Sequence, residues 1–410
     1  MRLTSTAAVV LAVLTLSPPA RAAGPGISDG VVRLGVLTDL SGPYADLSGP
    51  NAVLAARMAI DDFGGKVAGK PVDLVFADHL VRADVAANTA RKWFDEQGVD
   101  AVVDLTSSST ALAVMPIVNE KRRIALFSGP GTTAIAGEKC NAYTVHYTYD
   151  NWALANGTGR EVVADGGKTW FFITADYAFG KSLEEDTSAV VRAAGGKVLG
   201  SIRHPAPGTT DFSSFVLQAQ SSGAQIVGLA NAGADTISSI KAANEYGLTR
   251  TQKLAGLLIF LSDVHSLGLQ TAQGLYATTA FYWDLDDRTR AWSRRFQNHP
   301  DNRKKAMPTM VQAGIYSAVT HYLEAIRDTG TDDADVVMAR MKATPVNDFF
   351  SHGGRIGPDG LHRHDMYLVQ VKSPQESKYP WDYYRVVKRI PAGEAFPSVE
   401  QLRCPLAVKR

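Results

Sequence analysis

The clearest indication of the fold class is residues 31–63, which read VVRLGVLTDLSGPYADLSGPNAVLAARMAIDDF. A valine-rich apolar run, residues 31–38, leads into a turn with glycine and proline and then into a helical pattern over residues 50–63. A strand that is apolar on both faces is typical of a parallel sheet covered by helices on both sides. These residues therefore predict one strand–turn–helix unit of an α/β fold.

The unit recurs in two sets at intervals of about 30 residues, the length of a strand–helix–strand repeat. The predicted strands are residues 31–38, 72–77, 101–105 and 124–127 in the first set, and 169–174, 197–202, 226–230, 253–260 and 275–281 in the second. Helices are expected at residues 50–63, 84–97, 110–121, 180–194, 211–222, 236–246, 308–329 and 332–343, and final strands at 367–372 and 383–390. Two similar sets without a flexible linker predict two doubly wound lobes that meet at a hinge and enclose a cleft.

Charge and motifs exclude several classes of function. The chain carries 42 Lys and Arg against 41 Asp and Glu, so it has no basic footprint for nucleic acid or for an anionic membrane surface. No nucleophile elbow, zinc-protease motif or P-loop is present. Gly129-x-Gly131-x-x-Ala134 matches a dinucleotide fingerprint, but Pro130 occupies its turn. We expect no enzyme activity, no cofactor and no metal, and we interpret two further motifs, His362-Arg363-His364 and Arg303-Lys304-Lys305, as exposed turns.

Residues 1–22 are predicted to be a signal peptide. Arg2 precedes an apolar run, residues 3–16, that is too short to span a bilayer about 30 Å thick. The small-x-small pattern Ala20-Arg21-Ala22 indicates cleavage near Ala22. We therefore expect export and a mature chain that is not inserted in the membrane.

The chain has two cysteines, Cys140 and Cys404. In the oxidising compartment that export implies, we expect them to form a disulfide. That bond would tie the C-terminal tail, residues 391–410, to the first lobe. The alternative is two unrelated buried thiols.

Small polar residues follow several predicted strands, where ligands bind in open α/β sheets. The turns read TSSST at 106–110 and SGPGTT at 128–133, and a third turn, NAGAD, occupies 231–235. Hydroxyls and free backbone N–H groups at helix starts suit a small anion, especially a carboxylate. The alternative is that these serines and threonines only cap their helices.

Four motifs together resemble one family, over essentially the whole mature chain. They are LSGPYA at 40–45, the two first-lobe turns, and DYAFG at 176–180. All four resemble motifs of the type I periplasmic substrate-binding proteins of ABC transporters, in the branch named for branched-chain amino acids. The resemblance implies two Rossmann-like lobes joined by a three-segment hinge. It also implies lobe boundaries: residues 27–146 with 284–345 for the first lobe, and 147–283 with 346–390 for the second.

The resemblance also implies roles for particular residues. Ser107, Ser108 and Thr132 match positions that hold a ligand carboxylate, and Tyr177 matches a tyrosine that closes over the ligand. Closure around the ligand would then be recognised by the permease subunits of an ABC importer, or, as an alternative, by a receptor that uses the protein as a ligand sensor. We expect a periplasmic monomer.

One departure from the family bears on the ligand. Amino-acid binders of this family usually carry a carboxylate at the end of the strand that corresponds to residues 254–260, whereas this chain reads GLLIF at 256–260. A buried ammonium without a partner costs several kcal/mol, although Asp235 or Asp263 could replace the missing acid. We therefore predict an aromatic organic acid, with a branched-chain or other amino acid as the alternative. The candidate ligand-binding residues are Tyr44, Ser107, Ser108, Ser128, Thr132, Tyr149, Tyr177, Asn231, Asp235, Phe260 and Tyr282. For the aromatic residues near 281–283, packing at the hinge is the alternative.

Overall fold

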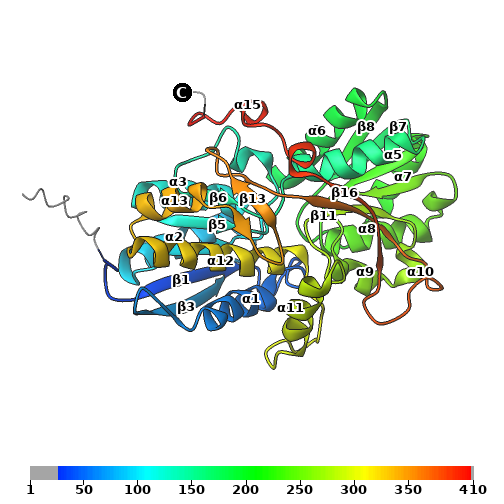
Figure 1. The fold of residues 1–410 in the computed structure, drawn as a ribbon. Coiled ribbons are helices and arrows are strands. Elements are labelled where there is room, and N and C mark those ends of the chain that lie inside the picture. The colour runs from blue at the N-terminus through cyan, green and yellow to red at the C-terminus, as the bar shows by residue number, and fades with distance from the viewer. Residues whose placement is uncertain (1–25, 408–410) are drawn as a thin grey trace, which may run out of the picture.

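The structure, a computed structural model, describes residues 26–407. The predicted signal peptide and its cleavage near Ala22 lie outside the described residues. Two separate sheets, each flanked by helices, form two lobes (Figure 1). The predicted two-lobed α/β fold is therefore confirmed. Within residues 26–407, no helix is both long and apolar enough to cross a membrane.

The first lobe is built on a six-stranded sheet of order β2-β3-β1-β4-β5-β6. Its strands are β1 (Val32–Thr38), β2 (Lys66–Val67), β3 (Lys70–Asp78), β4 (Ala101–Asp104), β5 (Ile124–Phe127) and β6 (Thr144–His146), parallel except for β2. Helices α1 (Gly49–Asp62) and α12 (Met310–Thr329) pack together, as do α2 (Ala83–Glu96) and α3 (Ser108–Lys121). A Cβ at Gly35 of β1 would lie 2.5 Å from the ring of Trp93, so glycine lets α2 approach the sheet.

The second lobe is built on a parallel sheet of order β10-β9-β7-β8. Its strands are β7 (Thr169–Ala175), β8 (Lys197–His204), β9 (Ile226–Ala230) and β10 (Lys253–Gly256). Its main helices are α6 (Ala178–Ala193), α7 (Ser213–Ser221) and α8 (Ala234–Glu245). Every residue of the inner strand β9 is buried, whereas exposed residues alternate along the edge strand β8. An inner strand of this sheet is thus buried on both faces, whereas the edge strand is exposed at alternate residues.

Two predicted strands differ from the structure. The strand expected at residues 253–260 ends at Gly256; after a short loop, the Asp263 carboxylate accepts the Phe260 N–H (2.9 Å) at the start of α9 (Leu261–Leu267). The strand expected at residues 275–281 is the short β11 (Tyr276–Thr279). It pairs antiparallel with β15 (Met366–Val371), which pairs with β16 (Tyr384–Ile390), so these three strands form a sheet of their own. The helices α11 (Asp287–Asn298) and α4 to α5 (residues 151–164) were not predicted.

The segment after α13 (Ala334–Ala343) runs beside the first lobe. It forms β12 (Val346–Asn347), β13 (His352–Ile356) and β14 (His362–Arg363), and Leu361 makes a bridge with His146 of β6. His362 and His364 lie against the carbonyl oxygens of Tyr147 (3.0 Å) and Thr148 (2.9 Å). Both histidines are buried, so the expectation of an exposed turn there was wrong. The predicted division, which assigns residues 346–390 to the second lobe as one block, remains a prediction.

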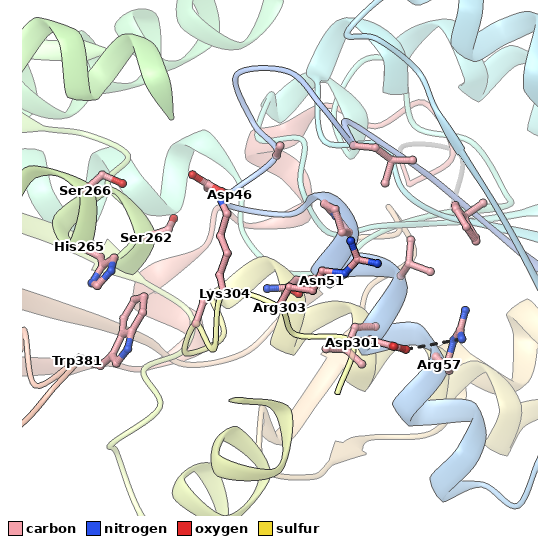
Figure 2. Close-up of a pocket in the computed structure, with 17 residues that line it drawn as sticks. Asp46, Asn51, Arg57, Ser262, His265, Ser266, Asp301, Arg303, Lys304 and Trp381 are labelled. Carbon is pink, nitrogen blue, oxygen red and sulfur yellow. Dashed lines mark hydrogen bonds and ion pairs between the residues drawn. The ribbon is translucent and has the colours of Figure 1, made fainter. Parts of the chain in front are cut away.

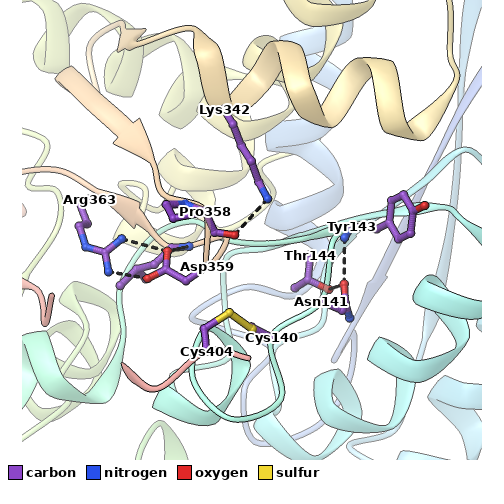
Figure 3. The surroundings of a disulfide bond; sticks show 10 residues. Cys140, Asn141, Tyr143, Thr144, Lys342, Pro358, Asp359, Arg363 and Cys404 are labelled. Carbon is purple, nitrogen blue, oxygen red and sulfur yellow. Dashed lines mark hydrogen bonds and ion pairs between the residues drawn. A yellow bond between two sulfur atoms is a disulfide. The ribbon is translucent and has the colours of Figure 1, made fainter. Parts of the chain in front are cut away.

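A disulfide joins Cys140 to Cys404, with their Cα atoms 5.6 Å apart (Figure 3). The predicted pairing is thereby confirmed. The tail that it ties down contains α14 (Ala392–Ala395) and α15 (Val399–Leu402). Beside the disulfide, Arg363 forms a two-pronged ion pair with Asp359 and donates from Nε to the Pro397 carbonyl oxygen (3.0 Å). The tail is thus fixed at two points, to Cys140 in the loop before β6 and to Arg363 of β14.

Candidate ligand-binding cleft

A small cavity lies between the lobes, at the carboxyl ends of strands from both parallel sheets. Its volume is about 10 Å³, room for about one water molecule. Strands β4, β5, β7, β9 and β10 each lead to one or more of its residues, as the fold class requires. The lining residues are Tyr44, Leu47, Thr106, Gly129, Tyr149, Tyr177, Phe179, Ala232, Leu258 and Phe260.

The turn after β1 fixes the position of Tyr44. The Asp39 carboxylate accepts the backbone N–H groups of Gly42 and Tyr44, each at 2.8 Å. A Cβ at Gly42 would lie 2.6 Å from that carboxylate, so glycine permits the turn. Burial raises the pKa of Asp39, and the two N–H bonds act in the opposite direction. The carboxylate is therefore a structural anchor that places Tyr44 at the cavity.

Contacts across the cleft hold the two lobes together. The hydroxyls of Tyr44 and Tyr177 lie 2.7 Å apart, and the Ala234 N–H donates to the Pro43 carbonyl oxygen (3.3 Å). Burial raises the pKa of Tyr44 and of Tyr177 above the ordinary phenol value, so both are neutral hydrogen-bonding groups at neutral pH. These bonds, with the small cavity volume, define a closed arrangement of the lobes.

The first-lobe side of the cleft offers donors to an anion. Ser107 is the residue before α3; it is 1% exposed, its side chain does not cap the helix, and its Oγ has no hydrogen-bond partner among residues 26–407. The neighbouring Ser108 Oγ accepts the N–H groups of Gly131 (3.3 Å) and Thr132 (3.2 Å), which joins the two hydroxyl-rich turns. A buried hydroxyl without a partner is unusual. Together with the positive end of the α3 dipole, it suits a carboxylate.

The two acids considered as partners for a ligand ammonium bond to the backbone instead. Asp235 accepts the Gly208 N–H (3.0 Å), and Asp263 accepts the Phe260 N–H (2.9 Å). Burial raises the pKa of Asp235 to about 6 and that of Asp263 to about 7. Neither lines the cavity, and the described lining contains no acidic or basic side chain.

The structure brings together four of the candidate residues predicted from the sequence, Tyr44, Tyr149, Tyr177 and Phe260, around the cavity. The other candidates are not among the described residues that line it. Ser107, Ser108 and Thr132 occupy the adjoining turns, as described above. Three more have partners away from the cavity: Ser128 bonds Thr148 and the Val311 carbonyl oxygen, Asn231 bonds Ser239 and Thr236, and the Tyr282 hydroxyl donates to the Trp381 carbonyl oxygen.

Six lining residues were not among the candidates. Thr106, Gly129 and Phe179 lie inside the quoted turn motifs, and Ala232 lies in the 231–235 turn. Treating every residue of these turns as a candidate would have found all four. Leu258 was assigned to a strand that in fact ends at Gly256. Leu47 reaches the cavity from the long loop before α1, and no pattern in the sequence indicates its direction.

Comparisons with known proteins agree on the fold and the class. A family model described as periplasmic binding protein matches residues 31–378. A periplasmic binding protein from Burkholderia mallei is 52% identical with a TM-score of 0.89, covering 92% of this chain and 99% of that one. A branched chain amino acid ABC transporter periplasmic ligand-binding protein from Burkholderia xenovorans is 41% identical (TM-score 0.81, covering 92% and 99%). An ABC transporter solute binding protein from R. palustris in complex with 4-hydroxybenzoate shares the fold at 22% identity (TM-score 0.79, covering 88% and 97%).

Proposed function

This chain belongs to the periplasmic binding proteins of ABC transporters, and we propose that the solute it captures is a small aromatic carboxylic acid. The carboxylate would be held by the Ser107 hydroxyl and the backbone N–H groups at the start of α3. The ring would lie among the aromatic side chains Tyr44, Tyr149, Tyr177 and Phe260. We further propose that the exported protein delivers this ligand to the permease subunits of an importer in the periplasm.

The observation that carries the proposal is the chemistry of the cavity lining. Among the described residues, half of the lining is aromatic and none of it is charged. An amino acid would bring an ammonium group into this closed space without an anionic partner, at a cost of several kcal/mol. An aromatic acid brings one negative charge, which the hydroxyl and the helix N-terminus can meet.

A second candidate is a branched-chain amino acid. It is favoured by the neighbour from Burkholderia xenovorans, which is named for branched-chain amino acids and is 41% identical to this chain. For this ligand to bind, Asp235 or Asp263 would have to turn away from its backbone partner toward the cleft. Both carboxylates are buried and hydrogen-bonded, which opposes that change.

Capture requires the lobes to open and then to close around the ligand with a larger cavity than this one, because about 10 Å³ does not admit a benzene ring. We propose that a ligand entering the open cleft bridges the lobes and so favours a closed arrangement that encloses it. The Tyr44–Tyr177 hydrogen bond would then form at the same time as the contacts to the ligand. The closed form is the one that the permease subunits would recognise.

The test is a thermal-shift and calorimetric screen of refolded, ligand-free protein. The panel contains benzoate, 4-hydroxybenzoate, 4-hydroxycinnamate, an aliphatic carboxylate, leucine, isoleucine and valine. A ligand at 100 times its dissociation constant adds about 2.7 kcal/mol to the free energy of unfolding. We expect aromatic acids to stabilise the protein. Stabilisation by leucine, isoleucine or valine alone would refute the proposal in favour of the second candidate.

A further inference from the structure

A second, larger hollow lies on the other side of the loop that carries Tyr44. It is a groove of about 720 Å³, which is within the usual range for small-molecule sites. Figure 2 shows that α9 and Trp381 of the second lobe form one side, and that α1 and the turn after α11 form the other. The groove and the cleft cavity have no lining residue in common.

The groove carries a positive charge that its own acids do not fully offset. Lys304 pairs with Asp46, and Arg57 lies 3.8 Å from Asp301. Both pairs are exposed, so each is weak. The Arg303 guanidinium makes no hydrogen bond or ion pair with any residue between 26 and 407. It is therefore free to receive a carboxylate in the two-pronged geometry that arginine favours.

The rest of the groove is largely apolar. On the first-lobe side the wall contains Leu40, Val53, Leu54 and Phe76, and Phe76 is 53% exposed although it is a large apolar residue. A groove lined by a free guanidinium and an apolar wall is complementary to a molecule with one carboxylate and one apolar body.

On the second-lobe side, the groove is lined by two stacked aromatic rings, those of His265 and Trp381. The His265 ring stacks on Trp381 at 4.1 Å between centroids with an interplanar angle of 11°, and its Nδ1 lies 2.8 Å from the Tyr383 hydroxyl. Burial lowers the pKa of His265, while the charge of Asp46 opposes the shift, so the imidazole is neutral at neutral pH. The stacked pair therefore presents a neutral planar face opposite the arginine. Since both lobes line the groove, a molecule bound in it favours the closed arrangement.

We propose that this groove is a second binding site for small organic acids that carry a ring or alkyl body. The carboxylate would bind Arg303 and the apolar body would lie against Phe76. This site gives Arg303, the first residue of the motif at 303–305, a role beyond that of a solvated turn. It takes the same class of ligand as the proposed cleft site but does not depend on it.

The experiment counts bound molecules of 4-fluorobenzoate per chain by fluorine NMR and equilibrium dialysis, using the full exported chain. We expect two bound molecules in the wild type, one in the cleft (the tighter site) and one in the groove (the looser site). Arg303→Ala should weaken the looser site about tenfold or more, and Phe76→Ser should weaken it while leaving the tighter site unchanged. Arg294→Ala is the matched control, because Arg294 is exposed and lies outside the groove. It should leave both sites unchanged.

Three outcomes decide between this inference and the proposed function. If Tyr177→Ala removes the tighter site and leaves Arg303-dependent binding, both proposals stand. If no tighter site exists but binding still depends on Arg303, the cleft proposal fails and the groove proposal stands. If the wild type binds one molecule or none, and Arg303→Ala behaves like Arg294→Ala, the groove proposal is refuted.

Discussion

The hydrogen bond between the Tyr44 and Tyr177 hydroxyls should contribute to ligand affinity because it forms only when the lobes close. The two oxygens lie 2.7 Å apart, and the residues come from opposite lobes. In Tyr44→Phe the Tyr177 hydroxyl loses its partner in the closed form, while in the open form water satisfies it. An unsatisfied buried hydroxyl costs about 1–3 kcal/mol. Since Tyr177 is only partly buried, we take the lower end, about 1 kcal/mol, which is about a fivefold weaker affinity.

The assay is isothermal titration of each variant with 4-hydroxybenzoate, together with urea unfolding. Tyr143→Phe is the matched control: its hydroxyl also donates at 2.7 Å, to Asp335, but both residues belong to the first lobe. We expect Tyr143→Phe to lower the free energy of unfolding without changing affinity. In the double variant Tyr44→Phe/Tyr177→Phe, the loss of affinity should be smaller than the sum of the single losses. Equal affinity losses in Tyr44→Phe and Tyr143→Phe, or strict additivity, would refute the reasoning.

Three other features of the structure can be tested in the same way. Ser107→Ala should weaken binding of 4-hydroxybenzoate several-fold in calorimetry and leave the urea midpoint unchanged, because the Ser107 Oγ has no partner to lose among residues 26–407. A shifted midpoint with unaltered affinity would contradict this. Reduction of the Cys140–Cys404 disulfide, which closes a loop of 264 residues, should lower the free energy of unfolding by roughly 5 kcal/mol at most without changing affinity; an unchanged unfolding curve with dithiothreitol would argue against it. Ligand affinity should fall as pH rises from about 5 to about 7 and then level off. Asp186 accepts the Thr133 hydroxyl across the lobes (3.2 Å), and burial raises the pKa of Asp186 to about 7 in the closed form. Closure therefore takes up a proton and is favoured at low pH. Asp186→Asn should flatten that profile, and an unaltered profile would show that another group titrates.

The strands of the two parallel sheets could be predicted from the sequence because each is an apolar run bounded by polar turns. Strands β5 and β9 match the predicted residues without error. The strand predicted at residues 253–260 was too long, since an apolar run alone does not distinguish a strand from a buried loop. The end of the run, Phe260, instead forms the start of α9, where the Asp263 carboxylate accepts its N–H. Strand β11 was placed in the wrong sheet because its partner, β15, follows it about 90 residues later.

The location of the cleft could also be predicted, but not the direction of each side chain in it. Ser128 and Ser107 both follow strands of the first sheet, so the sequence predicts a ligand contact equally for both. In the structure the Ser128 Oγ donates to the Val311 carbonyl oxygen of α12, whereas the Ser107 Oγ has no hydrogen-bond partner in the described part of the chain. A contact between residues 128 and 311 depends on how α12 packs under the turn. Local sequence therefore identifies the strand end, and tertiary packing decides which hydroxyl remains available.

The two proposed anion sites would hold a carboxylate by different means, and the difference follows from their exposure to water. In the cleft, neutral donors such as the Ser107 hydroxyl act in a closed space, where a hydrogen bond to a charge is strong and little screened by salt. In the groove, Arg303 is exposed, so its attraction extends into solvent but is weakened by salt and by competing water. The cleft lining is thus suited to selective binding after the lobes close. The groove, open to solvent in the closed form, is suited to loose binding of the same acids beside the loop that carries Tyr44.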